Sequence, residues 1–356
     1  MLVRLALLTF LAAAVHGQVP PPTERDYVIH DFRFTSGETM PELHLHYATL
    51  GTPRRDDSGV VRNAVLVLHG TGGSFKQFIN DRFAGVLFAP GGLLDANKYY
   101  IVIPDNIGHG QSSKPSDGLY AHFPHYDYDD MTELQRRLVV DALGVHHLRL
   151  ILGTSMGAMH AWVWGERWPD MMDGLVPLAS LPAAIAGRNR IWRKMMIDDI
   201  TSDPEWNGGE YKEQPRGLAA AVQILLIAGS APLQWQASAP TRDDADKWLA
   251  DQMKTRLATN DANDLLYALE ASRNYDPSPN LERITAPLLA INSADDFINP
   301  PELGIMEKLM PRVKHGRYIL LPTTEQTRGH GTHSLPAIWG RYLADFIREL
   351  TPTASQ

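Results

Sequence analysis

The sequence contains no cysteine, and this absence excludes several kinds of chemistry at once. Without a thiol the chain cannot form a disulfide bond, a thiolate metal site or a cysteine nucleophile. The stability of the fold must therefore come from its apolar core. A cysteine-free chain is compatible with an oxidising compartment, although it does not require one.

Basic residues are fewer than acidic ones, with 33 Lys and Arg against 41 Asp and Glu. The net charge is −8 at pH 7 and no long basic run occurs, so a nucleic-acid partner is not expected. No Lys-Ser or Lys-Thr pair follows the glycine-rich loop at 69–73, which argues against a phosphate-binding loop. His330 and His333 lack a third ligand at a recognisable spacing, and there is no His-Glu-x-x-His motif. We therefore expect neither a metal ion nor a cofactor.

Long apolar runs are missing, except for one at the start of the chain. Residues 5–15 are apolar apart from Thr9, Arg4 precedes them, and small residues reach Gly17. This pattern is typical of a secretory signal peptide over residues 1–17, and it is too short for a comfortable membrane span. The alternative is an apolar N-terminal helix of the fold. We expect a periplasmic or secreted protein without stable membrane insertion.

Short apolar runs alternate with helical patterns along most of the remaining chain. This alternation predicts an α/β fold with a mostly parallel central sheet and helices on both faces. The expected strands of this sheet are 64–68 and 99–103, both buried, followed by 148–152, 174–179, 287–292 and 317–321. Two antiparallel strands at 27–34 and 42–50 precede them, and amphipathic helices are expected at 131–143 and 335–350.

The alternation stops between residues 181 and 279. Four helical patterns occur there (190–199, 218–227, 243–257 and 262–273) without a clear buried strand. We therefore divide the chain into a signal peptide (1–17), a first core part (18–180), an inserted helical lid (181–279) and a second core part (280–356). Trp192, Trp206, Trp235 and Trp248 are candidates to line a site beneath this lid, with ordinary packing as the alternative.

The most informative motif is Gly153-Thr154-Ser155-Met156-Gly157, which follows an apolar run and precedes a helical pattern. This context predicts a nucleophile elbow, in which a serine occupies a strained turn between a strand and a helix. Glycines at both flanks allow the strand and the helix to approach closely. The alternative is a glycine-rich turn that carries a surface serine.

A serine nucleophile needs a base to accept its proton and an acid to orient that base. In the fold that carries this elbow, the acid and then the histidine follow the serine along the chain. Asp296 is the preferred acid, with Asp295 as the alternative, and His330 is the preferred base, with His333 as the alternative.

The loop His69-Gly70-Thr71-Gly72-Gly73 comes directly after the expected strand at 64–68. Such a loop can turn backbone N–H groups toward a developing oxyanion, together with the N–H of the residue after the nucleophile. These donors would be the backbones of Thr71 and Met156. The remaining histidines at this end of the chain, His69, His109 and His160, are expected to form local hydrogen bonds.

The residues resemble the α/β-hydrolase superfamily, and within it the homoserine O-acetyltransferase-like branch. The resemblance covers nearly the whole chain after the signal peptide and implies Ser155, Asp296 and His330 as a catalytic triad. It is carried by Ser36-Gly37-Glu38-Thr39, Phe123-Pro124, Gly153-Thr154-Ser155-Met156-Gly157, Asp203-Pro204-Glu205-Trp206, the stretch 260–276, Asp296-Phe297-Ile298-Asn299-Pro300 and Gly329-His330.

Three departures from this branch bear on the reaction. Thr154 and Ala158 replace the glycines that flank the serine motif of the acetyltransferases, and the loop at 69–73 is closer to that of general esterases. The branch's Tyr-Arg-Ser in the lid corresponds roughly to residues 230–232, which leaves that arginine missing. Export adds a further difficulty for acetyl transfer, because acetyl-CoA is a cytosolic donor.

We therefore expect an exported serine hydrolase whose partner is a small-molecule acyl ester. The first alternative is an acyltransferase that uses the same triad, and the second is a binding protein that has kept the fold without the chemistry. The acyl chain, the alcohol and the oligomeric state are left open, with a homodimer as one alternative.

Overall fold

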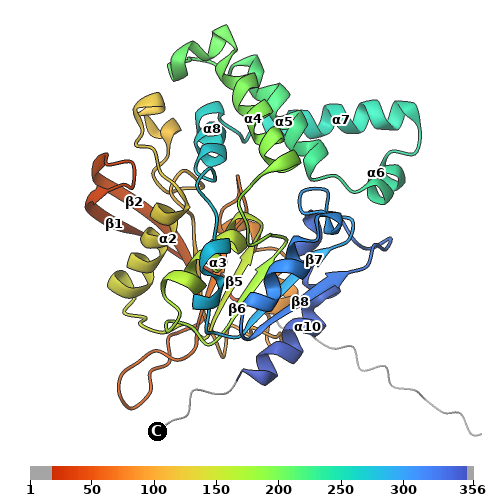
Figure 1. The fold of residues 1–356 in the computed structure, drawn as a ribbon. Helices are drawn as coiled ribbons and strands as arrows, with labels where there is room; N and C mark the ends of the chain where they lie inside the picture. The colour runs from red at the N-terminus through yellow and green to blue at the C-terminus, as the bar shows by residue number, and fades with distance from the viewer. Residues whose placement is uncertain (1–17, 351–356) are drawn as a thin grey trace, which may run out of the picture.

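One eight-stranded sheet organises the structure, a computed structural model in which residues 18–350 are described (Figure 1). The expected signal peptide lies outside these residues. The strand order is β1-β2-β4-β3-β5-β6-β7-β8; β1 and β2 run antiparallel to their neighbours and the other pairs are parallel. The bounds are β1 Thr23–Arg33, β2 Thr39–Leu50, β3 Ala64–Leu68, β4 Tyr100–Pro104, β5 Leu150–Thr154, β6 Leu175–Leu178, β7 Leu288–Ser293 and β8 Gly316–Leu321. The predicted fold class is confirmed.

The central strands are buried on both faces, as their continuous apolar sequences predict. In β3, Leu66 and Leu68 belong to the core that includes residues of α2 and α3, whereas Val65 and Val67 belong to the core that includes residues of α1 and α10. Helices therefore cover both faces of the sheet. These helices are α1 Ala84–Leu87, α2 Tyr128–Arg137, α3 Met156–Arg167 and α10 Pro336–Glu349.

The helix expected at 131–143 begins three residues earlier, at Tyr128, because Asp127 caps it. The Asp127 side chain accepts a hydrogen bond from the Asp130 N–H (3.0 Å), and the Asp130 side chain accepts one from the Asp127 N–H (3.2 Å). Such a reciprocal pair satisfies two N–H groups that the helix itself leaves unpaired. The last turn continues as a π-helical segment, Leu138–Ala142.

A helical insertion separates β6 from β7. It contains α4 Gly187–Thr201, α5 Arg216–Ala228, α6 Pro232–Ser238, α7 Arg242–Leu257 and α8 Ala262–Glu270, and it lies beyond the carboxyl ends of the parallel strands (Figure 1). The insertion has its own apolar core, in which Ile200, Leu218 and Leu265 are buried. The short α6 was not predicted. None of its residues is buried, so it carries no amphipathic pattern that would reveal it.

Among residues 18–350, no single helix is long and apolar enough to cross a membrane. Helices α5 and α6 pass the test of length and composition only as a pair, and they are bent by 111° at the break between them. Six residues of α5 are buried in the structure.

The loops after β3, β5, β7 and β8 all leave the same edge of the sheet, because these strands are parallel. The loops after β3, β5 and β7 begin immediately after strands that are buried along their whole length, and the loop after β8 begins at the buried Leu321 of the edge strand. The hydrogen bonds of each strand to its neighbours fix the place where its loop begins. Residues that are far apart in the sequence are thereby held at one edge, below the helical insertion (Figure 1).

The close packing of α3 on β3 gives the first testable prediction. A Cβ atom on Gly157 would lie 2.1 Å from the Leu68 carbonyl oxygen, a backbone atom that cannot move without disturbing the sheet. We expect Gly157→Ala to lower the free energy of unfolding by about 1–3 kcal/mol, measured by urea denaturation.

Gly340 in α10 is the matched control, because a Cβ atom there would meet only Leu93 Cδ1 at an ordinary 3.6 Å. Gly340→Ala removes a helix-interior glycine without a clash, and should raise the free energy of unfolding by about 0.5–1 kcal/mol. Equal effects of the two substitutions would contradict the close approach of α3 to β3.

Candidate active site

Ser155 lies on the turn between β5 and α3 with φ 52° and ψ −113°. A positive φ is unfavourable for a residue with a Cβ atom, so the surrounding structure must hold this conformation. Gly153 permits the turn, because a Cβ atom at that position would lie 2.0 Å from the Gly157 carbonyl oxygen. The Ser155 side chain is thereby presented at the carboxyl edge of the sheet, at the N-terminus of α3.

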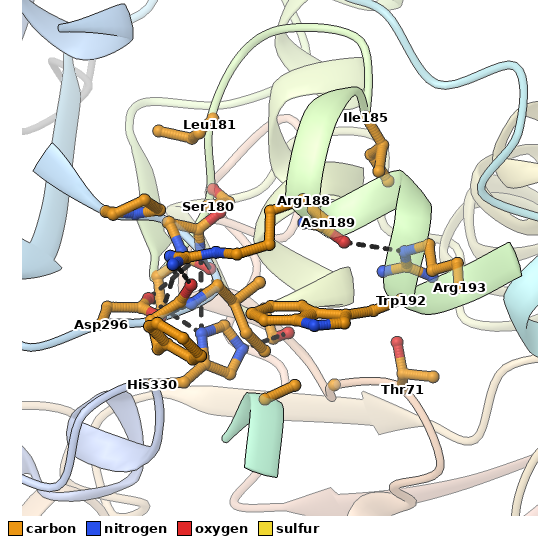
Figure 2. Close-up of a pocket in the computed structure, with 18 of the residues that line it drawn as sticks. Thr71, Ser180, Leu181, Ile185, Arg188, Asn189, Trp192, Arg193, Asp296 and His330 are labelled. Carbon is orange, nitrogen blue, oxygen red and sulfur yellow. Dashed lines mark hydrogen bonds and ion pairs between the residues drawn. The ribbon is translucent and has the colours of Figure 1, made fainter. Parts of the chain in front are cut away.

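His330 joins Ser155 to Asp296. Its Nε2 atom is 2.8 Å from Ser155 Oγ, and its Nδ1 atom is 2.9 Å from Asp296 Oδ2. Figure 2 shows His330 beside Asp296. Because a carboxylate can only accept, Nδ1 carries the proton and Nε2 is left to accept the hydrogen bond from the serine hydroxyl. The structure thus brings together the three side chains that the sequence singled out.

Asp296 is almost fully buried, at 1 % exposure, and every contact with it supports the ionised form. Its Oδ1 atom accepts hydrogen bonds from the N–H of Ile298 (2.8 Å) and of Asn299 (3.2 Å), and Asn299 Nδ2 donates to Oδ2 (3.1 Å). Burial acts to raise the pKa of Asp296, but His330 and the Asn299 donors outweigh it, so that the pKa is lowered from its usual value. Asn299 was not singled out in the sequence.

Asp295, the alternative acid, has a different set of partners. Its Oδ2 atom accepts hydrogen bonds from Thr327 Oγ1 (2.8 Å) and from the Gly329 N–H (3.0 Å), and Ser293 Oγ donates to its other oxygen. These bonds fasten the segment that leads into His330. The two adjacent aspartates therefore have different roles. Asp296 contacts the imidazole of His330, whereas Asp295 holds the loop that carries this histidine.

His333, the alternative base, does not reach Ser155. Its ring packs edge-to-face against His330, with 5.3 Å between the ring centroids. Burial, and then repulsion from His330, lower the pKa of His333 to about 3, so the ring stays neutral. A metal ion held by both histidines is disfavoured, because both ring nitrogens of His330 are already engaged by Ser155 and Asp296.

The glycine-rich loop lies directly against the serine. A Cβ atom on Gly70 would be 3.3 Å from the Ser155 Cβ. Gln77, which the sequence did not reveal, ties the loop to the elbow: its Oε1 accepts from the Gly70 N–H (3.1 Å) and its Nε2 donates to Thr154 Oγ1 (2.9 Å).

Two backbone donors at this place are unused. Throughout residues 18–350, neither the Thr71 N–H nor the Met156 N–H has a hydrogen-bond partner. Thr71 lines the cavity that contains Ser155, and Met156 is the first residue of α3, whose N-terminus favours negative charge. Among the described residues, both N–H groups are therefore free to donate hydrogen bonds to an oxyanion.

A buried polar network supports the loop from behind. His69 Nδ1 donates to the Gly70 carbonyl oxygen (2.8 Å), and His69 Nε2 accepts from the Asn106 N–H (3.0 Å). Gln135 Nε2 donates to Asn106 Oδ1 and to His160 Nδ1 (2.9 Å). Burial lowers the pKa of His69 to about 4, so this ring remains neutral and keeps its hydrogen-bonding pattern. The expectation of local hydrogen bonds holds for these histidines.

The site opens into a cavity of about 1370 Å³ between the sheet edge and the helical insertion. Trp192 of α4 forms one wall of this cavity (Figure 2). Its ring packs on the ring of Phe297, with 5.1 Å between the ring centroids. The other candidate tryptophans pack elsewhere: Trp235 and Trp248 contact each other at 4.8 Å, and Trp206 donates to Asn263 Oδ1.

Comparisons with known proteins agree with this geometry. Residues 63–320 match the family described as "alpha/beta hydrolase fold". A probable acyltransferase of Methanothermobacter thermautotrophicus is 30% identical over 291 residues, covering 81% of this chain and 88% of the relative. A homoserine O-acetyltransferase of Moorella thermoacetica is 29% identical over 366 residues, covering 89% and 93%. The crystal structure of esterase E22 shares the fold, with a TM-score of 0.77 and 20% identity over 93% of this chain and 100% of that one.

The buried histidines behind the glycine loop predict a pH effect on stability. Burial, and then the neighbouring His69, lower the pKa of His109 from 6.5 to about 3. Between these values the unfolded chain binds a proton that the folded chain does not, so the stability contributed by this histidine falls as the pH is lowered. His109→Gln removes the effect. We compare the unfolding free energy of the variant with that of the unsubstituted protein at each pH. The value for the variant minus the value for the unsubstituted protein should rise by about 2 kcal/mol when the pH is lowered from 7.5 to 5.0.

Urea denaturation of both proteins at the two pH values provides the measurement. His146 is the control, because its side chain is exposed and forms no hydrogen bond or ion pair within residues 18–350. His146→Gln should leave the difference in unfolding free energy independent of pH. A His109→Gln protein that shows the same constant difference would contradict the neutral, buried state of His109.

Proposed function

Because the chain belongs to the α/β-hydrolase fold family, and within it to the homoserine O-acetyltransferase-like branch, we propose that it is an exported serine hydrolase that cleaves a carboxylic ester. The observation that carries this proposal is the hydrogen-bonded chain from Ser155 through His330 to Asp296, at the floor of a cavity large enough for an ester. Export rests on the signal-peptide pattern of residues 1–17 alone.

The first half of the reaction forms an acyl-enzyme. Ser155 Oγ attacks the carbonyl carbon while His330 Nε2 takes the hydroxyl proton, and Asp296 stabilises the imidazolium that results. The carbonyl oxygen becomes an oxyanion and accepts hydrogen bonds from the N–H groups of Thr71 and Met156. Collapse of the tetrahedral intermediate breaks the ester C–O bond, and His330 gives its proton to the departing alcohol.

The second half releases the acid. Water enters where the alcohol left, His330 Nε2 takes one of its protons, and the hydroxide oxygen attacks the acyl carbon. The same N–H groups bind the second oxyanion. When the bond to Ser155 Oγ breaks, His330 returns a proton to the serine and the carboxylic acid leaves.

An acyltransferase is the second candidate, because two of the relatives bear acyltransferase names. The triad and the acyl-enzyme would be the same, and an acceptor hydroxyl would take the place of water in the second half. Three sequence features favour hydrolysis: the loop at 69–73, the absence of arginine at 230–232 and the signal-peptide pattern.

The test measures hydrolysis of p-nitrophenyl butyrate by variants of the three side chains. Ser155→Ala removes the nucleophile and should lower kcat by about 10⁶-fold. Asp296→Asn should lower kcat by about 10⁴-fold, because an amide at this position favours the wrong imidazole tautomer. Ser230→Ala is the matched control, since this serine also lines the cavity but its hydroxyl forms no hydrogen bond with the three side chains among the described residues; its kcat should change less than about threefold.

The same assay with added homoserine separates hydrolysis from transfer. Hydrolysis predicts that butyrate accounts for the p-nitrophenol released, whereas an acyltransferase would give O-butyrylhomoserine instead. Full activity of Ser155→Ala, or a fluorophosphonate probe that leaves Ser155 unlabelled in the folded protein, would overturn both readings.

A further inference from the structure

A buried arginine lies in the wall of the active-site cavity. Arg193 of α4 is only 8% exposed and lines the same cavity as Ser155 and Thr71. In Figure 2 its guanidinium lies on the far side of Trp192 from His330, above the Thr71 side chain. It belongs to neither the triad nor the expected oxyanion donors.

This arginine has no carboxylate partner within residues 18–350. Its Nε donates to Asn189 Oδ1 (3.1 Å) and its Nη1 donates to Ser272 Oγ (3.0 Å), and both acceptors are neutral. A guanidinium has five N–H donors. Asn189 and Ser272 therefore fix the orientation of the group while leaving other donors for a ligand.

The surroundings of Arg193 add one neutral hydroxyl and further positive charge. Tyr128 is 2% exposed, and its hydroxyl, which can donate or accept, makes no well-formed hydrogen bond although Thr71, Ser272 and Arg193 surround it. Arg190 lies three residues before Arg193 on α4; burial, and then Arg273 and Arg193, lower its pKa, whereas Glu270 raises it. The charged groups at this corner of the cavity are thus mainly arginines.

A buried, unpaired charge is unfavourable, and buried guanidinium groups are ordinarily paired with an anion. Nothing in the described protein supplies that anion beside Arg193. A bound ligand with a negative charge would supply it, and a planar carboxylate matches the geometry of the guanidinium fork. The unpaired charge faces the cavity in which the proposed substrate binds.

We propose that the ester carries a carboxylate and that Arg193 binds it, with Asn189 and Ser272 as positioning residues. This inference rests on the proposed function and narrows its substrate to anionic esters. Residues 230–232 contain no arginine, but Arg193 of α4 places a cation in the wall of the same cavity. Arg256 of α7 lines the cavity as well, but its buried Nε has no hydrogen-bond partner within residues 18–350 to orient the group.

Two matched pairs of esters test the proposal, since the carboxylate can belong to the acyl or to the alcohol part. The acyl pair is mono-4-nitrophenyl glutarate against 4-nitrophenyl valerate, and the alcohol pair is 4-acetoxybutanoate against butyl acetate. In at least one pair, the unsubstituted protein should show a kcat/KM for the anionic ester at least about tenfold above that of its neutral partner.

Substitutions locate the source of that preference. Arg193→Gln should lower kcat/KM for the preferred anionic ester by about 10²-fold or more, and change the neutral partner less than about threefold. Arg193→Lys, which keeps the charge and loses the fork, should retain part of the preference. Arg256→Gln is the matched control and should retain it fully. An Arg256→Gln protein that loses the preference while Arg193→Gln retains it would overturn the assignment.

Binding of the anionic probe to the Ser155→Ala protein is measured by calorimetry. Because this variant lacks the nucleophile, the measurement does not depend on catalysis. The probe that the kinetics favour, 4-acetoxybutanoate or mono-4-nitrophenyl glutarate, should bind this protein and lose about 10²-fold in affinity when Arg193→Gln is added. If no ester is hydrolysed, both probes are titrated; loss of binding on Arg193→Gln then supports the anion site although the hydrolase proposal has failed. Equal binding with and without Arg193, or no preference for either anionic ester, contradicts the inference.

Discussion

The backbone at Ser155 is the constraint on which the rest of the site depends. A serine at φ 52° is stable only because β5 and α3 close around it through two glycines whose missing side chains leave room for backbone atoms. This turn fixes three things together: the direction of the hydroxyl, the start of α3 at Met156, and the place at which the loop after β3 can approach. A different conformation at this one residue would separate the hydroxyl from both His330 and the free N–H groups.

The parallel sheet converts that local turn into a complete site. Strands β5, β7 and β8 end at one edge, so the serine, the aspartate and the histidine meet although the sequence between them spans the whole helical insertion. Hydrogen bonds from neighbouring residues hold the aspartate, the histidine loop and the glycine loop in place. Asn299 and Ile298 hold Asp296, Asp295 holds the loop of His330, and Gln77 holds the glycine loop.

Sequence patterns predicted most of this scaffold, and the reasons are physical. The strand at 64–68 was located to the residue because a strand buried on both faces reads as an unbroken apolar run, and the serine motif was legible because its glycines are sterically required. The sequence favoured Asp296 over Asp295 as the acid and His330 over His333 as the base, but it could not exclude either alternative. Only the tertiary contacts of Asp295 and His333 show that neither of them takes that place. The roles of Gln77, Asn299 and Arg193 could not be predicted, because each depends partly on a contact with a residue far away in the chain. These contacts are with Thr154 for Gln77, with the Ala179 carbonyl oxygen for Asn299 and with Ser272 for Arg193. The exposed helix α6 was missed for want of an apolar face.

The most direct measurement is a crystal structure of the protein after reaction with a p-nitrophenyl alkylphosphonate, which mimics the tetrahedral intermediate. The account predicts phosphorus bonded to Ser155 Oγ, with the phosphonyl oxygen about 2.7–3.1 Å from the N–H groups of both Thr71 and Met156. His330 Nε2 should lie within hydrogen-bonding distance of Ser155 Oγ or of the oxygen that represents the leaving alcohol. A phosphonyl oxygen directed away from both N–H groups, or phosphorus attached to another side chain, would contradict the account.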